Sequence, residues 1–423
     1  MSIALAILIT LLVSALTLYI GANLATSEKR LLYRPRRLYT SGDADFKRAL
    51  GILLGPPLLC GNRVTTLING DQIFPPMLAA IRDATVSVTF ETFVFRDAIG
   101  AEFCAALSDA ARRGAKVHIL LDWVGSSSMD PKLLENTRAA GCDLQLYHPL
   151  SWYHLGRMNN RTHRKLLVVD GRVGFTGGAG MGNEWLGNAQ DPQHWRESHY
   201  QAEGPVVAQM QAVFIDNWIK ATGRVLHGKE FFPGNLPTVG DMDAQMFGSS
   251  PVGGSESMHL MVLLALTAAQ TSIDIENAYF VPDRLTVEAL IAAATRGVRV
   301  RIIVPGRHTD ARVGRWAAHA LYGDLMRAGV EIYEYQPTMI HCKVMVIDGT
   351  WSSVGSANFD DRSFRLNDEA NLNVFSGDLA QEQIRYIEAD IAQSKRMAPR
   401  RWARRAISRR VYEQLALLLR SQL

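Results

Sequence analysis

The most restrictive feature of the sequence is a short motif that occurs twice. Residues 163–170 read HRKLLVVD and residues 341–348 read HCKVMVID, so each copy places a lysine two residues after a histidine and an aspartate five residues after that lysine. Gly177 and Gly355 then follow at the same offset. A single strand histidine is commonplace, but core packing does not explain two copies at matching spacing. The duplication predicts two like domains that each bring one histidine to a shared cleft.

Each motif lies in an apolar run that predicts a β-strand. Side chains alternate between the two faces of a strand, so His341 and Lys343 share a face and Cys342 points away, as a packing residue. The run ends at Asp348-Gly349, which is a turn signal. An imidazole and an ammonium on one face supply a nucleophile or acid together with a donor for phosphate oxygens.

The two halves of the chain repeat the same order of patterns. Residues 88–95 parallel 273–280, and 113–121 parallel 296–304. Strands alternating with helices, such as a helix over 99–113 and a buried strand over 116–122, predict an α/β fold with a mixed, mostly parallel sheet flanked by helices in each half. The expected organisation is an anchor (1–27), a basic and proline-rich connector (28–61), a first domain (62–225), a linker (226–255), a second domain (256–393) and a basic amphipathic helix (394–423).

The first 27 residues carry no charged side chain. As a helix, the apolar stretch from Ile3 to Ala25 would span roughly 34 Å, against about 30 Å of bilayer hydrocarbon. Lys29 and Arg30 follow it, whereas a secretory signal carries its positive charge before the apolar core. The pattern predicts a retained transmembrane helix, crossing once, with the remaining chain in the cytoplasm by the positive-inside rule.

The last thirty residues are rich in arginine. At 100° per residue, Ile407, Val411, Leu415 and Leu418 form one stripe, and Arg405, Arg409 and Arg420 lie opposite. Such a basic amphipathic helix suits an anionic membrane surface, although an ordinary helix packed on the body shows the same pattern and nucleic acid also attracts arginines. The aromatic and basic loop after Pro149 is either a wall of the substrate entrance or a solvated surface loop.

Composition narrows the classes of function. The 423 residues are 48% hydrophobic and 20% charged with a net charge of +4, which is an ordinary globular composition. The four cysteines form no CxxC pair, which fits a reducing compartment. The chain has no HExxH, Walker loop or strand-linked GxGxxG, so we expect no metal and no cofactor.

Two histidines in one cleft suit displacement at a phosphodiester. One histidine attacks phosphorus and forms a covalent phosphohistidine, and the other protonates the departing alkoxide and then deprotonates the incoming alcohol or water. Lys165, Lys343 and Asn358 are expected to hold the nonbridging oxygens. From the residues alone, either histidine could be the nucleophile, since the halves are quasi-equivalent.

A histidine nucleophile needs a fixed tautomer, hence a carboxylate or carbonyl on its other nitrogen. Glu369 lies 28 residues after His341, on a candidate neighbouring strand, and Glu197 lies 34 residues after His163. We expect these glutamates to be the orienting carboxylates. The alternative is that each is a solvated surface residue.

The duplicated HxK(x)4D motif resembles that of the phospholipase D superfamily. With residues 61–81, 194–205 and 354–372, the chain is similar to bacterial cardiolipin synthases of that superfamily. The resemblance implies two phospholipase D-like domains that convert two phosphatidylglycerols to cardiolipin and glycerol through a phosphatidyl-histidine. It implies His163 as the nucleophile and His341 as the general acid/base, with Lys165 and Lys343 beside them. The motif aspartates, Asp170 and Asp348, are then weaker catalytic candidates, because in this family they are mainly structural.

The first motif departs from the family pattern. The family commonly has an asparagine 17 residues after the histidine, as Asn358 follows His341, but here Gly180 stands at that position and the nearest asparagine is Asn183. We expect Asn358, Asn183 and Ser356 to bind substrate phosphate.

Several functions remain open from the sequence. The partners implied by the resemblance are phosphatidylglycerol, cardiolipin and an anionic membrane surface, in the bacterial inner membrane and without nucleic acid. Hydrolysis by a phospholipase D, transfer to another alcohol such as ethanolamine or serine, a nuclease and a non-catalytic membrane scaffold are the alternatives.

Overall fold

A single mixed β-sheet runs through the whole body of the protein. The computed structural model describes residues 3–24, 31–149, 159–251 and 256–423. Within these residues, sixteen strands form one sheet. Fifteen of them follow one another as hydrogen-bonded neighbours, and the sixteenth, β5, pairs with β17. The path runs β18-β13-β12-β10-β14-β15-β17-β9-β1-β8-β7-β6-β2-β3-β4.

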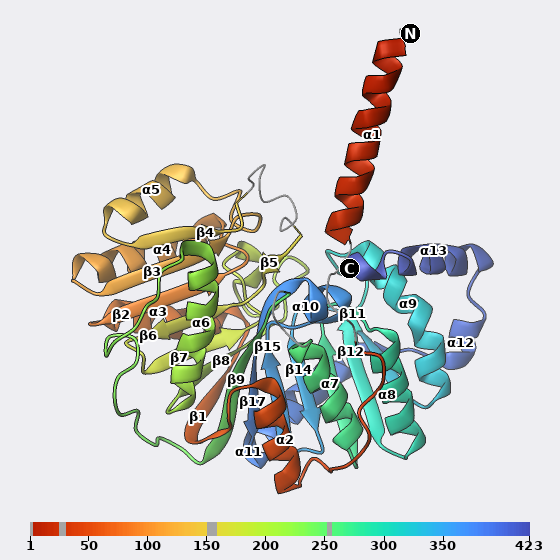
Figure 1. Ribbon diagram of the computed structural model, residues 1–423. Helices are drawn as coiled ribbons and strands as arrows, with labels where there is room; N and C mark the ends of the chain where they lie inside the picture. Colours follow the sequence, from red (N-terminus) through yellow and green to blue (C-terminus); the bar gives the residue numbers. More distant parts are fainter. Residues whose placement is uncertain (1–2, 25–30, 150–158, 252–255) are drawn as a thin grey trace.

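The two halves of the chain form two lobes with the same order of elements, as the sequence repeat predicts (Figure 1). The first lobe comprises β1 (Leu59–Ile68), α3 (Asn69–Asp83), β2 (Ser87–Thr92), α4 (Asp97–Arg112), β3 (Lys116–Asp122), α5 (Pro131–Ala139), β4 (Asp143–Tyr147), β5 (Arg161–Thr162), β6 (Leu166–Val169), β7 (Val173–Gly177), η2 (Asn183–Trp185), β8 (Ser198–Glu203) and α6 (Val206–Thr222). The second lobe comprises β9 (Met242–Ser249), α7 (Ser257–Ala268), β10 (Ser272–Asn277), β11 (Phe280–Val281), α8 (Arg284–Thr295), β12 (Arg299–Pro305), α9 (Arg312–Arg327), β13 (Glu331–Tyr335), β14 (Lys343–Ile347), β15 (Trp351–Gly355), β16 (Phe359–Asp360), α10 (Asp361–Arg365), β17 (Asn367–Phe375) and α11 (Gly377–Ala392).

Antiparallel pairs are more numerous than parallel ones in this sheet, so the expectation of mostly parallel sheets is wrong. Parallel pairing joins β2, β3 and β4 in the first lobe and β10, β12 and β13 in the second. The strands that carry the repeated motifs are antiparallel to their neighbours, because the short Asp-Gly turns after β6 and β14 make hairpins with β7 and β15.

The segment expected to be a linker contains a central strand. β9 pairs antiparallel with β1 on one side and with β17 on the other, so it joins the sheets of the two lobes. β9 corresponds to β1 in the order of the repeat, and each precedes the first helix of its lobe. The connector before the first lobe also contains structure, namely α2 (Ala44–Leu54), whose buried residues Phe46 and Leu50 pack in the core of the second lobe.

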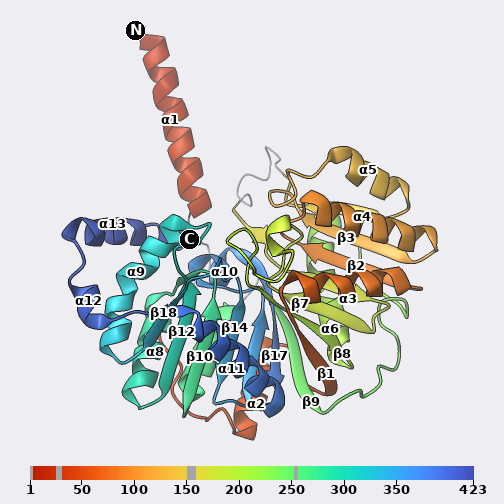
Figure 2. The same cartoon turned by 180° about the vertical axis from the view of Figure 1, so that it is seen from behind.

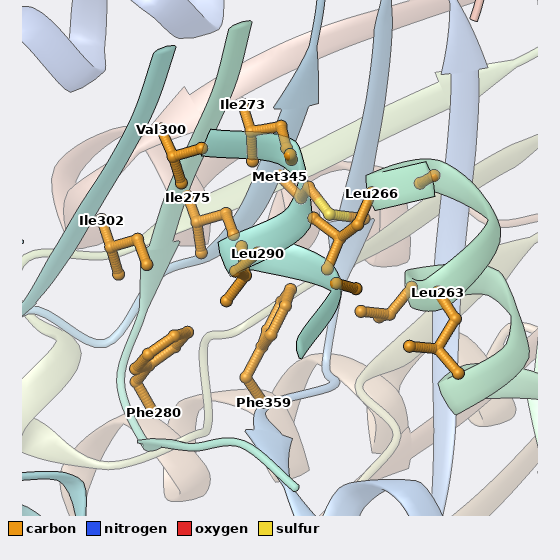
Figure 3. Packing of buried hydrophobic residues seen from close by; sticks show 14 of the residues in the cluster. Leu263, Leu266, Ile273, Ile275, Phe280, Leu290, Val300, Ile302, Met345 and Phe359 are labelled. Atoms are coloured by element: carbon orange, nitrogen blue, oxygen red, sulfur yellow. The ribbon is translucent and has the colours of Figure 1, made fainter. Parts of the chain in front are cut away.

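Helices cover both faces of the sheet. In the first lobe α6 lies on one face and α3 and α4 on the other (Figures 1 and 2). In the second lobe α7 and α8 pack on β10, β12 and β14, where Leu263, Leu266 and Leu290 meet Ile275 and Ile302 (Figure 3). The third buried cluster joins α6 and α11 to strands of both lobes, so the lobes share part of their core.

Helix α1 (Ile3–Leu24) stands away from the body, close to the C-terminal end of the chain (Figures 1 and 2). Its large apolar residues are exposed, for example Ile3 at 81% and Leu18 at 74%. Within the described residues we find no helix with enough length and hydropathy to cross a membrane, and the transmembrane helix expected at the N-terminus is therefore not supported.

The C-terminal segment is not one amphipathic helix. It divides into β18 (Ser394–Arg396), α12 (Pro399–Ala403), α13 (Ile407–Leu417) and η3 (Arg420–Gln422). α13 packs on α9 with its polar side inward, because Arg405 and Arg409 pair with the buried Glu413. The apolar stripe faces outward instead: Ile407, Val411, Leu415 and Leu418 are 77%, 50%, 55% and 78% exposed.

Candidate active site

A cavity of about 450 Å³ lies between the two lobes, and both motif histidines line it. His163 and Lys165 reach it from the first lobe, and His341 and Asn358 from the second. The prediction that the repeat brings two histidines to one cleft is therefore confirmed geometrically. The aromatic and basic loop considered as an entrance wall lies mostly in 150–158, outside the described residues.

His163 is oriented by a carboxylate of the other lobe. Its Nδ1 lies 3.1 Å from both carboxylate oxygens of Glu369 on β17. A carboxylate can only accept, so Nδ1 carries the proton and Nε2 is left with its lone pair. Burial lowers the pKa of His163, and Glu369 offsets only part of that effect. The imidazole is therefore neutral near pH 7, as a nucleophile must be.

The second histidine is oriented in the same way. His341 Nδ1 lies 2.6 Å from Glu197 Oε2, next to the start of β8 in the first lobe. Burial, with Lys343 beside the ring, holds the pKa of His341 well below its ordinary value. Three aromatic rings surround this imidazole, with centroid distances of 5.4 Å to Trp185, 5.3 Å to Trp195 and 5.9 Å to Tyr279.

The pairing of histidines with glutamates is crossed between the lobes: Glu369 of the second lobe orients His163, and Glu197 of the first lobe orients His341. The backbone N–H of His163 donates to the carbonyl oxygen of Asp368 (2.8 Å), and that of His341 donates to Arg196 (2.8 Å). Beside the contact between His163 and Asp368, β5 pairs in parallel with β17. These short inter-lobe pairings set each histidine beside the glutamate that follows its backbone partner.

Both motif lysines fold back onto their own motif. Lys165 Nζ donates to the carbonyl oxygen of His163 (2.7 Å), and Lys343 Nζ donates to that of His341 (2.6 Å). Lys343 Nζ also lies 3.1 Å from His341 Nε2, the atom that faces the reacting group. Burial lowers the pKa of both lysines, to about 7 for Lys165. Lys165 lines the cavity, whereas Lys343 is not among the residues that line it and contacts it through His341.

The motif aspartates lie away from the cavity and accept hydrogen bonds from backbone N–H groups. Asp170 accepts hydrogen bonds from the N–H groups of residues 85, 86 and 87, where β2 begins. Asp348 does the same for residues 270, 271 and 272 at the start of β10. Both residues have a positive φ, 52° in each case, which shapes the turn after the motif strand. Neither is among the residues that line the cavity.

The three residues expected to bind phosphate occupy different environments. Asn358 lines the cavity, and its buried Oδ1 has no hydrogen-bond partner within the described residues. Ser356 instead donates its hydroxyl to Glu369 and does not line the cavity, so it supports the orienting carboxylate. Asn183 is exposed and outside the cavity lining, with its N–H bonded to Asp97 (3.2 Å).

Trp185 lies against Gly180, the position at which an asparagine was sought. A Cβ at Gly180 would lie 2.9 Å from Val94 Cβ and 3.0 Å from the Trp185 ring. That ring lines the cavity, and its Nε1–H donates to Glu197 (3.2 Å). The indole therefore packs against Gly180 with one edge and holds the carboxylate that orients His341 with its N–H.

Sequence reasoning missed three groups that complete the site. Trp185 and Ser363 each donate to an orienting glutamate, the latter from Oγ to Glu369 Oε1 at 2.7 Å. Tyr279 donates its hydroxyl to Asp310 (2.6 Å) and places its ring against His341. Ser363 lies within the 354–372 stretch that already resembled the family, whereas nothing local to Trp185 or Tyr279 distinguishes them from core aromatics.

Comparison with known proteins identifies the family. The family described as cardiolipin synthase, PLD-like domain, matches residues 77–218 and 262–391. Cardiolipin synthase A of Pseudomonas fluorescens Pf-5 is 36% identical over 377 residues, covering 88% of this chain and 76% of that protein. The probable cardiolipin synthase YwiE of Bacillus subtilis is 32% identical, covering 84% and 71%.

A solved structure shows the same fold. Phosphatidylserine synthase of Haemophilus influenzae superposes with a TM-score of 0.66 at 14% identity, covering 89% of this chain and all of that one. Both lobes match the family, each with its own histidine and lysine, and the sequence relatives extend over most of the chain. The chain therefore belongs to the cardiolipin synthase family of proteins with phospholipase D-like domains.

Proposed function

We propose that this protein is a phosphatidyltransferase that converts two phosphatidylglycerols to cardiolipin and glycerol. The observation that carries the proposal is the pair of buried His–Glu contacts, 3.1 Å and 2.6 Å, whose imidazoles line one cavity. Each glutamate holds the proton of the neutral imidazole on Nδ1, so Nε2 is the reacting nitrogen. Family membership supports the choice of lipid substrate.

The reaction proceeds in two displacements. His163 Nε2 attacks phosphorus of the first lipid, and the bond from phosphorus to the head-group glycerol oxygen breaks. His341 enters this step as the imidazolium, a form that the negative charge of the bound phosphodiester favours, and gives its Nε2 proton to that oxygen. His341 then takes a proton from a hydroxyl of the second phosphatidylglycerol, whose oxygen displaces His163 from phosphorus. Lys165, Lys343 and Asn358 hold the nonbridging oxygens in both steps.

Differences between the two glutamates support His163 as the nucleophile. Burial alone would raise the pKa of Glu369, but His163 and Lys165 outweigh it and the pKa is lowered. The pKa of Glu197 is raised by its burial. Glu369 therefore keeps its negative charge more readily, and that charge stabilises the cationic phosphoimidazole that a nucleophilic histidine becomes.

The same proposal places the protein at the cytoplasmic face of a bacterial inner membrane. α1 and the outward stripe of α13 expose apolar side chains at one end of the molecule, near the end of the chain (Figure 1). Burying such side chains in lipid is favourable by about 25 cal/mol per Å². Contact with the bilayer at this end brings the protein to its lipid substrates.

The first test follows head-group-labelled phosphatidylglycerol in vesicles through the wild type, His163→Ala and His341→Ala. We expect cardiolipin and free glycerol from the wild type, neither product from His163→Ala, and no cardiolipin from His341→Ala. His341→Ala should accumulate the covalent lipid adduct if His163 is the nucleophile, with slow release of glycerol. Phosphatidic acid without cardiolipin would make the protein a hydrolase and overturn the transferase assignment.

A further inference from the structure

Two arginines in the cavity stand outside the two His-Lys sets that act on the reacting phosphate. Four lysine and arginine side chains of the described residues line this cavity. Lys165 belongs to the catalytic set, and Arg96 is paired with Glu184. Arg161 and Arg362 remain, one from each lobe.

Arg161 is held beside His163 with one nitrogen unpaired. Thr162 between them points into the core, where its hydroxyl donates to Glu91, so the alternation of strand side chains sends Arg161 and His163 to the cavity side. Arg161 is 6% exposed. Its Nε and Nη2 donate to carbonyl oxygens, but within the described residues its buried Nη1 makes no hydrogen bond.

Arg161 forms a long ion pair with the buried carboxylate of Asp122. Asp122 Oδ1 lies 3.5 Å from Arg161 Nη1 and is already engaged by the N–H groups of residues 124 and 125. Burial raises the pKa of Asp122 to about 6, so this carboxylate is still mostly ionised near pH 7 and balances part of the Arg161 charge. Arg161 Nη1 nevertheless makes no hydrogen bond within the described residues, and Arg161 lines the cavity, where an anion can accept one.

Arg362 reaches the same part of the cavity from α10. It follows Asn358 by four residues, and its Nη1 and Nη2 both donate to Asn159 Oδ1 at 3.0 and 3.1 Å. It forms no ion pair within the part of the chain that the structure describes. Burial lowers the pKa of Arg362, while Asp360 acts to raise it and the charge of Arg161 to lower it. Arg161 and Arg362 line the same cavity, where their guanidinium groups offer planar donors to a bound phosphate.

We propose that Arg161 and Arg362 form a subsite for the phosphodiester of the acceptor lipid. The inference rests on the proposed transfer between two phosphatidylglycerols. In that reaction the attacking hydroxyl and the acceptor's own phosphate are joined by a three-carbon glycerol, so both phosphates must enter one cavity. The His-Lys sets hold the reacting phosphate, and the arginine pair holds the second. Water and simple alcohols carry no such group, so the subsite selects phosphatidylglycerol as acceptor.

The test compares two acceptors that use the same donor and the same phosphohistidine. Vesicles of phosphatidylglycerol in neutral lipid are supplied with labelled glycerol, and the full chain is assayed for cardiolipin formation and for exchange of glycerol into phosphatidylglycerol. Arg161→Gln and Arg362→Gln should lower cardiolipin formation by about 10- to 100-fold, the effect of losing a charged hydrogen bond. Glycerol exchange should change by less than about twofold, because that acceptor has no phosphate.

Two further variants separate a subsite from a structural role. Arg362→Lys keeps the charge and should recover part of the cardiolipin activity, and Arg112→Gln removes an exposed arginine of α4 that pairs with Asp109, so both activities should persist. An equal loss of both activities in the glutamine variants would assign the arginines to the donor phosphate or to folding and overturn the subsite. Unchanged cardiolipin formation would also overturn it. A wild type that exchanges glycerol but never forms cardiolipin would overturn the proposed function itself.

Discussion

His163 and Glu369 meet with 3.1 Å between Nδ1 and each carboxylate oxygen, although 206 residues separate them in the sequence. Each lobe thus supplies the base that orients the histidine of the other lobe, and neither lobe holds a complete site. The two lobes together form the catalytic unit. The core that joins α6 and α11 to strands of both lobes fixes their relative position.

Replacing Glu369 by glutamine should slow the chemical step while leaving the fold intact. Glutamine keeps the size of the side chain but loses the charge that stabilises the phosphoimidazole. We expect formation of the covalent adduct to fall by about 10²- to 10⁴-fold, the range for a disabled acid-base partner. Single-turnover kinetics with labelled phosphatidylglycerol measure this rate.

The matched control for that substitution is Glu102→Gln, which changes an exposed glutamate of α4 paired with Arg82. Glu197→Gln should act on the step that His341 assists, so the adduct should persist longer than in wild type. A loss of less than tenfold in Glu369→Gln, or an equal loss in Glu102→Gln, would contradict the crossed pairing as a catalytic device.

The Michaelis constant for phosphatidylglycerol should rise as the pH increases. Burial lowers the pKa of Lys165 to about 7, so its ammonium is present below pH 7 and is lost above it. Above pH 7 the free enzyme therefore has one cation fewer with which to bind the substrate phosphate. We expect KM to increase between pH 6 and pH 9 in the wild type and to increase less in Lys165→Arg, whose guanidinium stays charged. A pH-independent KM in the wild type would refute this assignment.

Restoring the family asparagine at Gly180 should destabilise the protein. Its Cβ would lie 2.9 Å from Val94 Cβ and 3.0 Å from the Trp185 ring, so the indole or the backbone must shift. We expect Gly180→Asn to reduce the free energy of unfolding by about 1–3 kcal/mol, as overpacking does. Gly42→Asn is the control, because no atom lies within 4 Å of its Cβ position. Equal melting temperatures for the two variants would show that the site accommodates both groups.

Removing the carboxylate of Asp348 should reduce stability and leave the chemistry of the folded fraction unchanged. Asp348 accepts three backbone hydrogen bonds, and we expect Asp348→Ala to cost about 2 kcal/mol. Burial opposes ionisation, but hydrogen bonds from Ser41 and the 270–272 backbone outweigh it and lower the pKa of Asp348.

The pH dependence of that effect has a defined sign. A lowered folded pKa means that the stabilisation is full above the unfolded value of about 3.9 and disappears as the pH falls through the folded value. Denaturant unfolding of wild type and Asp348→Ala at pH 7 and below pH 4 should show the difference at the higher pH and a smaller one at the lower. A loss of activity without a loss of stability would mean that Asp348 has a catalytic role.

The exposed stripe of α13 should bind lipid. Ile407→Gln and Leu418→Gln each remove a large, mostly exposed apolar side chain. Because burying such a side chain is worth about 1.5–3 kcal/mol, we expect vesicle binding to weaken by at least about tenfold per substitution. Co-sedimentation with anionic vesicles measures the change, and Val225→Gln, at an exposed residue after α6, is the control. Equal binding of all three variants would exclude α13 as a lipid contact.

The sequence by itself determined the repeat and its local chemistry. Lys116–Asp122 is a strand with the expected bounds, and the helix expected over 99–113 begins and ends within two residues of α4. His341 and Lys343 share a face, while Cys342 turns to the opposite side and contacts Arg196 and Ser198. These features depend on residues near one another in the chain, whose periodicity fixes which side chains share a face.

Only the tertiary structure decided which residues from distant segments meet. It crossed the glutamates between lobes through the β5–β17 pairing, packed Trp185 against Gly180, and left the apolar stripe of α13 outward while the buried Glu413 pairs with Arg405 and Arg409. Each of these outcomes depends on strand pairing or on a buried charge partner far along the sequence. Local patterns of polarity do not encode such partners, because a strand or helix offers the same face to any neighbour of suitable shape.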